Sequence, residues 1–364
     1  MTAKENKPTK LFSTYLIKHK AAIFGLIMQY NPSDIHFFFE SLACTGYNDT
    51  LIILYSNIDK DTKKYIISFS IFFEIIMIPM QLTQDMQGNI IYINHATLIR
   101  IYRDNKLFKR ISGEIFHKVE ILQLSFECGD FRFEVAHYLY NNHFFDDYDL
   151  LFITDIGDVL FQSDIRMFNY TDGVYVVEEA GITIKNSHYW LEMYNADYRP
   201  FENKIELCVG TLVLVGKKSF SFLNDLHNEI QDHIDLIFQR PNFQGTLNFL
   251  IYNNSYHYPE DYVRFLTTSH GIINSIAKLN GHIENFNKKR HFNRVNNLYD
   301  IYYHDRNFIL YNHDLQKLAV IHHTKYLPIT QNLTFRGVLN ICRNEFPTIF
   351  KMVMNIQAAN YILF

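Results

Sequence analysis

Two aspartates, Asp155 and Asp158, stand directly after an apolar run in the segment LLFITDIGDVLFQSD, residues 150–164. The run at 150–153 is typical of a strand buried on both faces, and ligands of open α/β sheets collect beyond the carboxyl ends of such strands. Two carboxylates at that edge suit a hard divalent cation, which prefers oxygen ligands and bridges to nucleotide phosphates. The alternative is that both acids only end the strand in a turn.

The elements that must position these acids alternate between strand and helix through the first half of the chain. In chain order they are a strand at 21–28, a helix opened by Pro32 and Ser33, a strand at 51–57, a helix from about Asp61, a strand at 75–78 and a helix at 131–142. Strands linked by helices in this way pair in parallel. The order therefore predicts a Rossmann-like, doubly wound α/β sheet that binds a nucleotide.

Beyond Asp164 the pattern changes to mixed elements, with apolar segments at 173–181 and 206–220 and helices at about 219–237 and 244–253. No internal repeat and no low-complexity linker divides the chain. We therefore expect one catalytic domain at 16–332, made of halves at about 16–165 and 166–332. A flexible tail at 1–15 precedes this domain, and a helical appendage at 333–364 follows it.

Composition narrows the class of protein. The chain has 364 residues, 48% of them hydrophobic, which is enough to bury a large core. A net charge of −4 gives no support for a nucleic-acid-binding surface over the whole molecule. The basic segment 285–294 (NFNKKRHFNR) is interpreted first as a solvated loop and second as a phosphate or acceptor contact.

Targeting signals are not evident in the sequence. The polar N-terminus lacks a secretory core, and the apolar segment 65–80 contains Glu74 and is too short to span a membrane, so a buried helix followed by a core strand is expected there. The four cysteines have no zinc or redox spacing. These features favour a cytoplasmic protein without a stable membrane span, and leave open an unusual compartment such as a viral factory.

At this point the chain resembles GT-A fold glycosyltransferases of the group whose strand-end motif is close to T-D-x-R-D-x-x-F-Q-x-D. This group is distantly similar to the glycogenin-like enzymes with their D-x-D motif. The matching segment is TDIGDVLFQSD, residues 154–164. Further blocks follow in family order: EEAGITIKNSHYW with Trp190, CVGTLVLVG with Gly210, FQGTLNFL with Gln244 and Asn248, and VIHHTKY with His322. The resemblance covers about residues 22–328. It implies a GT-A domain whose first half binds the nucleotide and whose second half binds the acceptor.

The resemblance also implies roles for single residues. Asp155 and Asp158 would take the places of the D-x-D acids and, with His322, would hold Mn²⁺ or Mg²⁺; His323 competes with His322 for that role. A bound divalent cation neutralises the charge that builds on a departing diphosphate.

Other residues would contact the substrates. Arg132 and Lys325 would meet the diphosphate, and Gly210 would let the backbone approach the donor sugar. Gln244 and Asn248, one helical turn apart, would face sugar hydroxyls. Glu179 or its neighbour Glu178 would serve as a general base in an inverting enzyme, with at most one of them entering the cleft.

Two positions depart from the family pattern. Gly157 stands where an arginine is usual, and Phe243 stands where an acid usually precedes Gln244. The sequence thus predicts a metal-dependent hexosyltransferase that uses a nucleotide sugar, a UDP-sugar first, and a saccharide or protein hydroxyl as acceptor, with retention favoured. The alternative is a non-catalytic relative that acts as a carbohydrate-binding or scaffold protein. A nucleotidyltransferase ranks last because the N-terminal half lacks a Gly-rich basic loop.

Overall fold

The computed structural model describes residues 19–79, 82–84, 90–93, 97–101, 108–112, 121–122, 131–186, 199–232, 243–253, 256–259, 261–267, 270–275, 303–304, 308–312, 314–322 and 328–360. The structural statements below concern these residues. The tail at 1–15, Trp190, the basic segment at 285–294, His323 and Lys325 lie outside them.

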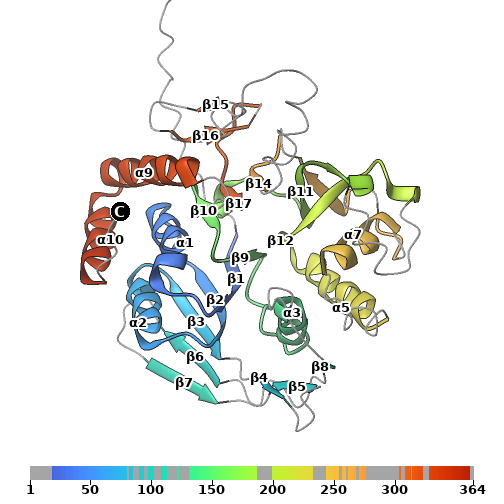
Figure 1. Ribbon diagram of the computed structural model, residues 1–364, viewed down its shortest axis with the longest axis horizontal. Coiled ribbons are helices and arrows are strands. Elements are labelled where there is room, and N and C mark those ends of the chain that lie inside the picture. Colours follow the sequence, from blue (N-terminus) through green and yellow to red (C-terminus); the bar gives the residue numbers. More distant parts are fainter. Residues whose placement is uncertain are drawn as a thin grey trace, which may run out of the picture.

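A large mixed sheet forms the centre of the protein (Figure 1). Its path in the described residues is β10-β17-β14-β11-β12-β9-β1-β2-β3-β6-β7, with β13 beside β11. The strands are β1 Ala21–Met28, β2 Thr50–Ser56, β3 Glu74–Pro79, β6 Thr97–Ile101, β7 Phe108–Ser112, β9 Leu150–Asp155, β10 Val159–Phe161, β11 Gly173–Thr183, β12 Ile205–Val215, β13 Val263–Leu266, β14 Ile273–Ser275 and β17 Val320–His322. Smaller sheets contain β4 Leu82–Gln84, β5 Ile90–Ile93 and β8 Ile121–Leu122, and β15 Tyr303–His304 with β16 Leu310–Tyr311.

The pairing within the sheet is parallel in one half and mixed in the other. Strands β9, β1, β2 and β3 pair in parallel, as the alternating sequence pattern predicts. Strand β12 is antiparallel to both β9 and β11, and β14 runs parallel to β17. The prediction of a doubly wound, mixed α/β sheet is therefore confirmed.

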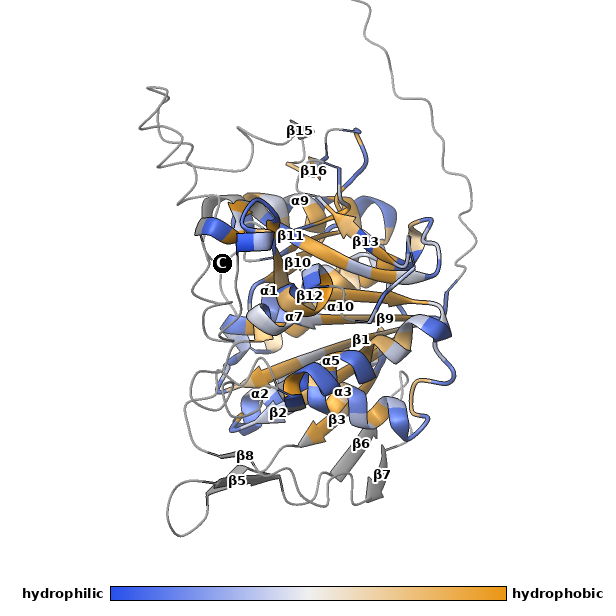
Figure 2. Cartoon of the chain, turned by 90° about the vertical axis from the view of Figure 1, so that its right-hand side faces the viewer, coloured by the Kyte–Doolittle hydropathy of each residue, from blue (hydrophilic) through white to orange (hydrophobic). Residues whose placement is uncertain are grey.

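Helices cover both faces of the sheet (Figure 2). They are α1 Pro32–Cys44, α2 Lys60–Ser68, α3 Phe131–Asn141, α5 Phe222–Asp232, α7 Phe243–Asn253, α9 Pro328–Glu345 and α10 Pro347–Ala359. One core packs beneath α1, α2, α9 and α10, and a second beneath α3, α5 and α7. All residues of β2 are buried, because apolar side chains on both of its faces meet one of these two cores.

Local signals fix where the first helices begin. Asn31 caps α1 and forms a reciprocal capping box with Asp34, while Pro32 takes the first helical turn. Asp59 caps α2 by accepting a hydrogen bond from the Thr62 amide. Because β1 and β2 pair in parallel, both strands end at the same edge of the sheet.

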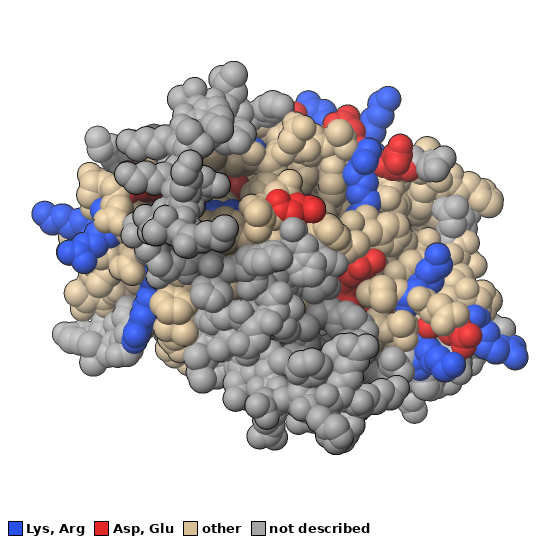
Figure 3. Space-filling view, turned by 90° about the horizontal axis from the view of Figure 1, so that it is seen from above, with Lys and Arg blue, Asp and Glu red and all other residues tan. Residues whose placement is uncertain are grey.

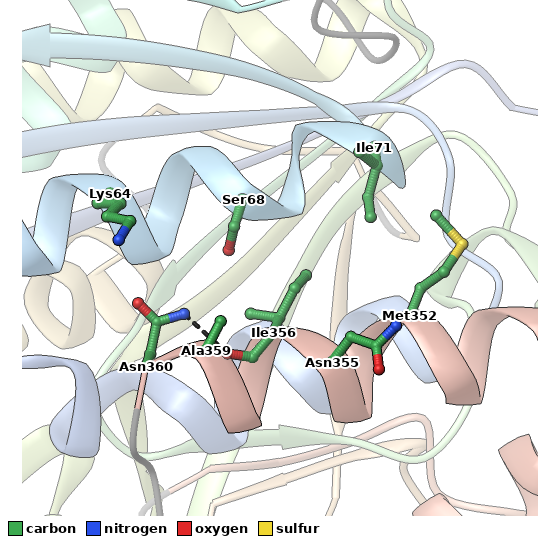
Figure 4. A pocket seen from close by; sticks show the side chains of 8 residues that line it. All are labelled: Lys64, Ser68, Ile71, Met352, Asn355, Ile356, Ala359 and Asn360. Carbon is green, nitrogen blue, oxygen red and sulfur yellow. Dashed lines mark hydrogen bonds between the residues drawn. The ribbon is translucent and has the colours of Figure 1, made fainter.

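The C-terminal helices pack against α1 and close a shallow groove. The helical region begins at Pro328, five residues before the start expected from the sequence. Phe335 of α9 contacts Phe37 of α1 edge to face, with ring centroids 4.9 Å apart. The groove between α2 and α10 has a volume of about 270 Å³ and includes Lys64, Ser68, Met352 and Asn360 in its lining (Figure 4).

Among the described helices, none combines the length and apolar character needed to cross a bilayer.

Candidate metal centre

The metal ligands expected from the sequence come together at one edge of the sheet. Asp155 is the last residue of β9, and Asp158 lies in the turn that leads into β10. His322 ends β17, which pairs antiparallel with β10 so that Val159 lies opposite His322. The pairing of strands β10 and β17, rather than closeness in sequence, brings His322 to the two aspartates.

The three side chains converge on a small volume. The His322 Nε2 atom lies 2.9 Å from Asp155 Oδ2 and 3.3 Å from Asp158 Oδ1. One ligand atom from each residue lies within 4.8 Å of the others. His322 is fully buried and Asp158 nearly so, while the Asp155 side chain is 33% exposed. Two carboxylate oxygens and an imidazole nitrogen suit a divalent cation, and the exposure of Asp155 leaves a side of the cluster open to a ligand.

Charged neighbours keep Asp155 ionised. Burial opposes its charge, but the Arg132 guanidinium and the hydrogen bond with His322 hold the pKa of this carboxyl far below its usual range. For His322, burial also disfavours the charged form, but the Cys208 sulfur, the Asp158 carboxylate and the hydrogen bond with Asp155 raise the pKa of the imidazole well above its ordinary value. In the absence of a cation, a proton on His322 is therefore shared between two carboxylates.

Gly210 of β12 provides the space that the cluster needs. A Cβ atom at this position would lie 2.1 Å from the His322 Cε1 atom and 2.7 Å from Asp155 Oδ2. Real Cβ atoms do not approach so closely, so only glycine fits here with the ligands in place. The family resemblance implies that Gly210 lets the backbone approach the donor sugar. In the structure, the Gly210 backbone lies against the side chains of His322 and Asp155.

Arg132, at the start of α3, supports the open side of the cluster. Its guanidinium forms an ion pair with Asp155 and donates a hydrogen bond to the Val209 carbonyl oxygen at 3.0 Å. The side chain is 2% exposed, and its Nε atom has no hydrogen-bond partner among the described residues. A buried arginine with a free N–H suits a further acceptor such as a phosphate oxygen.

Three residues expected at the substrates lie on strand β11 and helix α7. Glu179 is buried on β11 and accepts a hydrogen bond from the Ser275 hydroxyl at 3.0 Å. Gln244, on α7, donates to the buried Glu206 carboxylate at 2.5 Å. The Asn248 amide pairs with both the N–H and the carbonyl oxygen of Leu207, so it fixes β12 just before Gly210. Their catalytic roles stay predictions.

The two departures from the family pattern have structural counterparts. A Cβ at Gly157 would lie 2.8 Å from the Tyr30 ring, so an arginine here would have to displace that ring. Phe243 is buried in the core beneath α7. Although position 243 carries no acid, β12 brings the carboxylate of Glu206 to the neighbouring Gln244.

Three polar partners of the predicted residues were missed from the sequence: Cys208 beside His322, Ser275 beside Glu179 and Glu206 beside Gln244. Cys208 lies two residues before Gly210 on β12, so the two-residue period of a strand was the available signal. Ser275 gave no signal, because it joins the site only through the pairing of β14 with β11 and β17.

The surface above the sheet carries both signs of charge. Figure 3 shows Lys and Arg side chains lying next to Asp and Glu side chains in the right-hand part of this face. Charges of both signs in one area give a weaker long-range field than a surface of one sign.

Comparisons with known proteins give similarity at the level of whole structures only. No family model and no curated protein matches this sequence. A galactosyltransferase, LgtC, solved with donor and acceptor sugar analogues, is 11% identical, covers 87% of this chain and 95% of its own, and has a TM-score of 0.44. The glycosyltransferase GlyE of Streptococcus pneumoniae is 11% identical with a TM-score of 0.46. That alignment covers 90% of this chain but only 64% of GlyE.

Proposed function

We propose that this protein is a metal-dependent glycosyltransferase that transfers a sugar from a nucleotide sugar to a hydroxyl of a saccharide or protein. The first candidate for the donor is a UDP-sugar. The observation that carries the proposal is the convergence of Asp155, Asp158 and His322 beyond the carboxyl end of β9, beside Gly210. In open α/β sheets this edge is where nucleotide ligands bind.

The charges of the cluster suit a diphosphate substrate. With a neutral His322, the side chains of Asp155, Asp158 and Arg132 sum to −1, so a divalent cation leaves the site with a net positive charge. When bound, such a cation supplies Lewis-acid stabilisation of the leaving diphosphate. The imidazole in the ligand set favours Mn²⁺ over Mg²⁺, which prefers oxygen ligands alone.

Arg132 has two tasks in this proposal. It keeps Asp155 ionised and fixed through their ion pair. Its positive charge beside the one-third-exposed Asp155 also attracts a phosphate oxygen on that side. We also assign Lys325 to the diphosphate, as its distance of three residues from His322 suggests.

On the acceptor side we assign Gln244, whose half-buried amide has both a donor and an acceptor for sugar hydroxyls and is held by its hydrogen bond to the buried Glu206 carboxylate. Retention is the proposed stereochemical course, because the Glu179 carboxylate is already bound to Ser275. A retaining enzyme can act without the general base that an inverting enzyme requires.

The test is release of nucleoside diphosphate from a panel of nucleotide sugars with Mn²⁺ or Mg²⁺. Wild type is compared with Asp158→Ala and His322→Ala, and Asp225→Ala on α5 serves as the control outside the cluster. We expect release that depends on the cation, is lost in both cluster variants and persists in the control. Nucleotide-sugar binding without any release would favour the non-catalytic carbohydrate-binding alternative, and neither binding nor release would reject the proposal.

A further inference from the structure

A row of buried polar side chains lies behind His322, on the side of the ring away from the two aspartates. Its Nδ1 atom is 3.3 Å from the Cys208 sulfur. Ser275 hydrogen-bonds to Cys208, and its hydroxyl donates to Glu179 Oε2 at 3.0 Å. His322 and Ser275 are 0% exposed, and Cys208 and Glu179 are 1% exposed. Four polar groups thus form one connected row out of contact with solvent.

The backbone register of the sheet builds this row. Ser275 of β14 lies opposite Glu179 of β11 on one side and opposite His322 of β17 on the other. Cys208 reaches the same place from β12, where it pairs with Val177 of β11. Since each member stands on a paired strand, the row is held by the sheet and not by mobile loops.

The donors in the row point in one direction. A histidine that offers Nε2 to a cation carries its ring proton on Nδ1, and the Cys208 sulfur is placed to accept that N–H. The Cys208 S–H can donate in turn to the Ser275 oxygen, whose own hydrogen goes to Glu179. A carboxylate, which only accepts, ends the chain of donors.

We infer that Cys208 is a positioning residue that holds the His322 ring in the orientation and tautomer required for a cation at Nε2, with Ser275 and Glu179 fixing Cys208 from behind. The inference rests on the proposed function in one respect, the use of Asp155, Asp158 and His322 as cation ligands. It gives Glu179 a positioning role in place of the catalytic one expected from the sequence. Partners of this kind behind a metal-binding histidine set its ring orientation and the strength of the metal bond.

The experiment measures how tightly Mn²⁺, without any nucleotide, binds to wild type, Cys208→Ala and Cys208→Ser. The paramagnetic resonance signal of free Mn²⁺ reports the unbound fraction. Cys342→Ala is the matched control, because Cys342 is also fully buried but lies on α9. We expect Cys208→Ala to weaken binding roughly 10- to 100-fold, the usual effect of losing such a partner. Cys208→Ser keeps a hydrogen-bond acceptor and should restore most of the affinity, and Cys342→Ala should bind as wild type.

Two spectra separate positioning from other roles. Co²⁺ bound to wild type should show no thiolate-to-cobalt charge-transfer band, because the sulfur faces Nδ1 and not the cation. In the protein without metal, the ¹⁵N resonances of the His322 ring should change in Cys208→Ala and return toward wild type in Cys208→Ser. A charge-transfer band that disappears in Cys208→Ala would make Cys208 a ligand and overturn the inference.

The remaining outcomes are also decisive. Equal Mn²⁺ affinity in Cys208→Ala and Cys342→Ala would overturn the inference. If wild type binds no Mn²⁺, the proposed function fails, and the ring resonances alone decide on Cys208: unchanged resonances in Cys208→Ala reject its role. If Cys208→Ala does not fold, Ser275→Ala takes its place. We expect Ser275→Ala to bind Mn²⁺ several-fold more weakly than wild type, and binding with wild-type affinity would overturn the inference.

Discussion

Two regions of this protein bury a carboxyl group and treat its charge in opposite ways. Asp155 at the end of β9 lies among Arg132, His322 and Asp158, and its pKa lies far below the usual range. Glu40 of α1 is buried between Tyr65 of α2 and Gln357 of α10, and burial raises its pKa to about 8. The same functional group is thus ionised beside charged partners and neutral beside uncharged ones.

The difference separates a site built for chemistry from a contact built for structure. An ionised cluster costs desolvation energy and gives little stability in return, which agrees with the proposed role of this cluster in binding a cation. The neutral Glu40 joins three helices through hydrogen bonds and fixes the C-terminal helix α10 to the domain. If this contrast is right, changes in the two regions must affect different measurements.

The largest expected effect concerns Glu40 and pH. The folded pKa of about 8 lies above the unfolded value of 4.5, so the stability from this group is complete below pH 4.5 and is lost as pH rises to about 8. At 1.36 kcal/mol per pH unit, the loss is at most about 5 kcal/mol. Glu40→Gln cannot ionise, so its unfolding free energy in urea should change far less over this range. Asp61→Asn at the exposed start of α2 is the control, and a Glu40→Gln protein that loses stability as steeply as wild type would refute a neutral Glu40.

Gly210→Ala tests the charged region by sterics alone. The new Cβ would lie 2.1 Å from His322 Cε1, so the ring must move away from the aspartates. We expect Mn²⁺ affinity to fall about 100-fold, or about 3 kcal/mol. Gly157→Ala is the matched control, because the atoms nearest to its Cβ belong to the Tyr30 side chain and not to a cluster ligand, and less than about tenfold loss is expected there. Calorimetric titration with Mn²⁺ measures both, and equal affinities would show that the cluster is not the binding site.

Much of this arrangement could be predicted from the sequence, because its signals are local. Strand β9 is a continuous apolar run that ends in acids, and α1 begins with a proline directly after its cap. The histidine of the centre is different, since it lies 167 residues after Asp155 and only a family resemblance indicated it.

The rest depends on contacts between distant strands. Cys208 and Ser275 reach His322 only through the strand order β17-β14-β11-β12. The neutral state of Glu40 depends on Gln357, which is 317 residues away. In the sequence, Glu40 is an ordinary helical acid, and nothing near it indicates that three helices enclose its carboxyl group.

Arg132→Ala should separate stability from metal binding within the charged region. Loss of the guanidinium leaves Asp155 without its cation, and the one-third exposure of Asp155 limits the expected cost to about 1–3 kcal/mol in the absence of metal. Mn²⁺ should stabilise the variant more than it stabilises wild type, because Arg132 no longer neutralises a ligand. Thermal unfolding with and without Mn²⁺ measures this. Lys20→Ala, which removes an exposed ion pair with Asp147, should change little, and a stable Arg132→Ala protein would contradict the role of the pair.

The smallest expected effect, taken over a single pH unit, concerns His322. Its pKa is raised well above 6.5, so the stability it contributes without metal is complete below that value and is lost as pH rises through the folded pKa. Mn²⁺ binds only the neutral His322 ring. At pH values below the folded pKa, the affinity of the protein for Mn²⁺ should therefore rise about tenfold, or about 1.4 kcal/mol, for each pH unit. Each Mn²⁺ that binds should release one proton. Titration calorimetry in buffers of different ionisation enthalpy measures that proton.

Both His322 and Glu40 thus lose stability as pH rises, but only the loss at His322 can be offset by a cation. In the Glu40→Gln background, Mn²⁺ should therefore remove most of the remaining decline in unfolding free energy with rising pH. In wild type the same concentration of Mn²⁺ should leave the Glu40 part of the decline in place. If the part of the decline that Mn²⁺ offsets differs between the two proteins, the two buried groups do not titrate independently, and the contrast between the charged and the neutral region would fail.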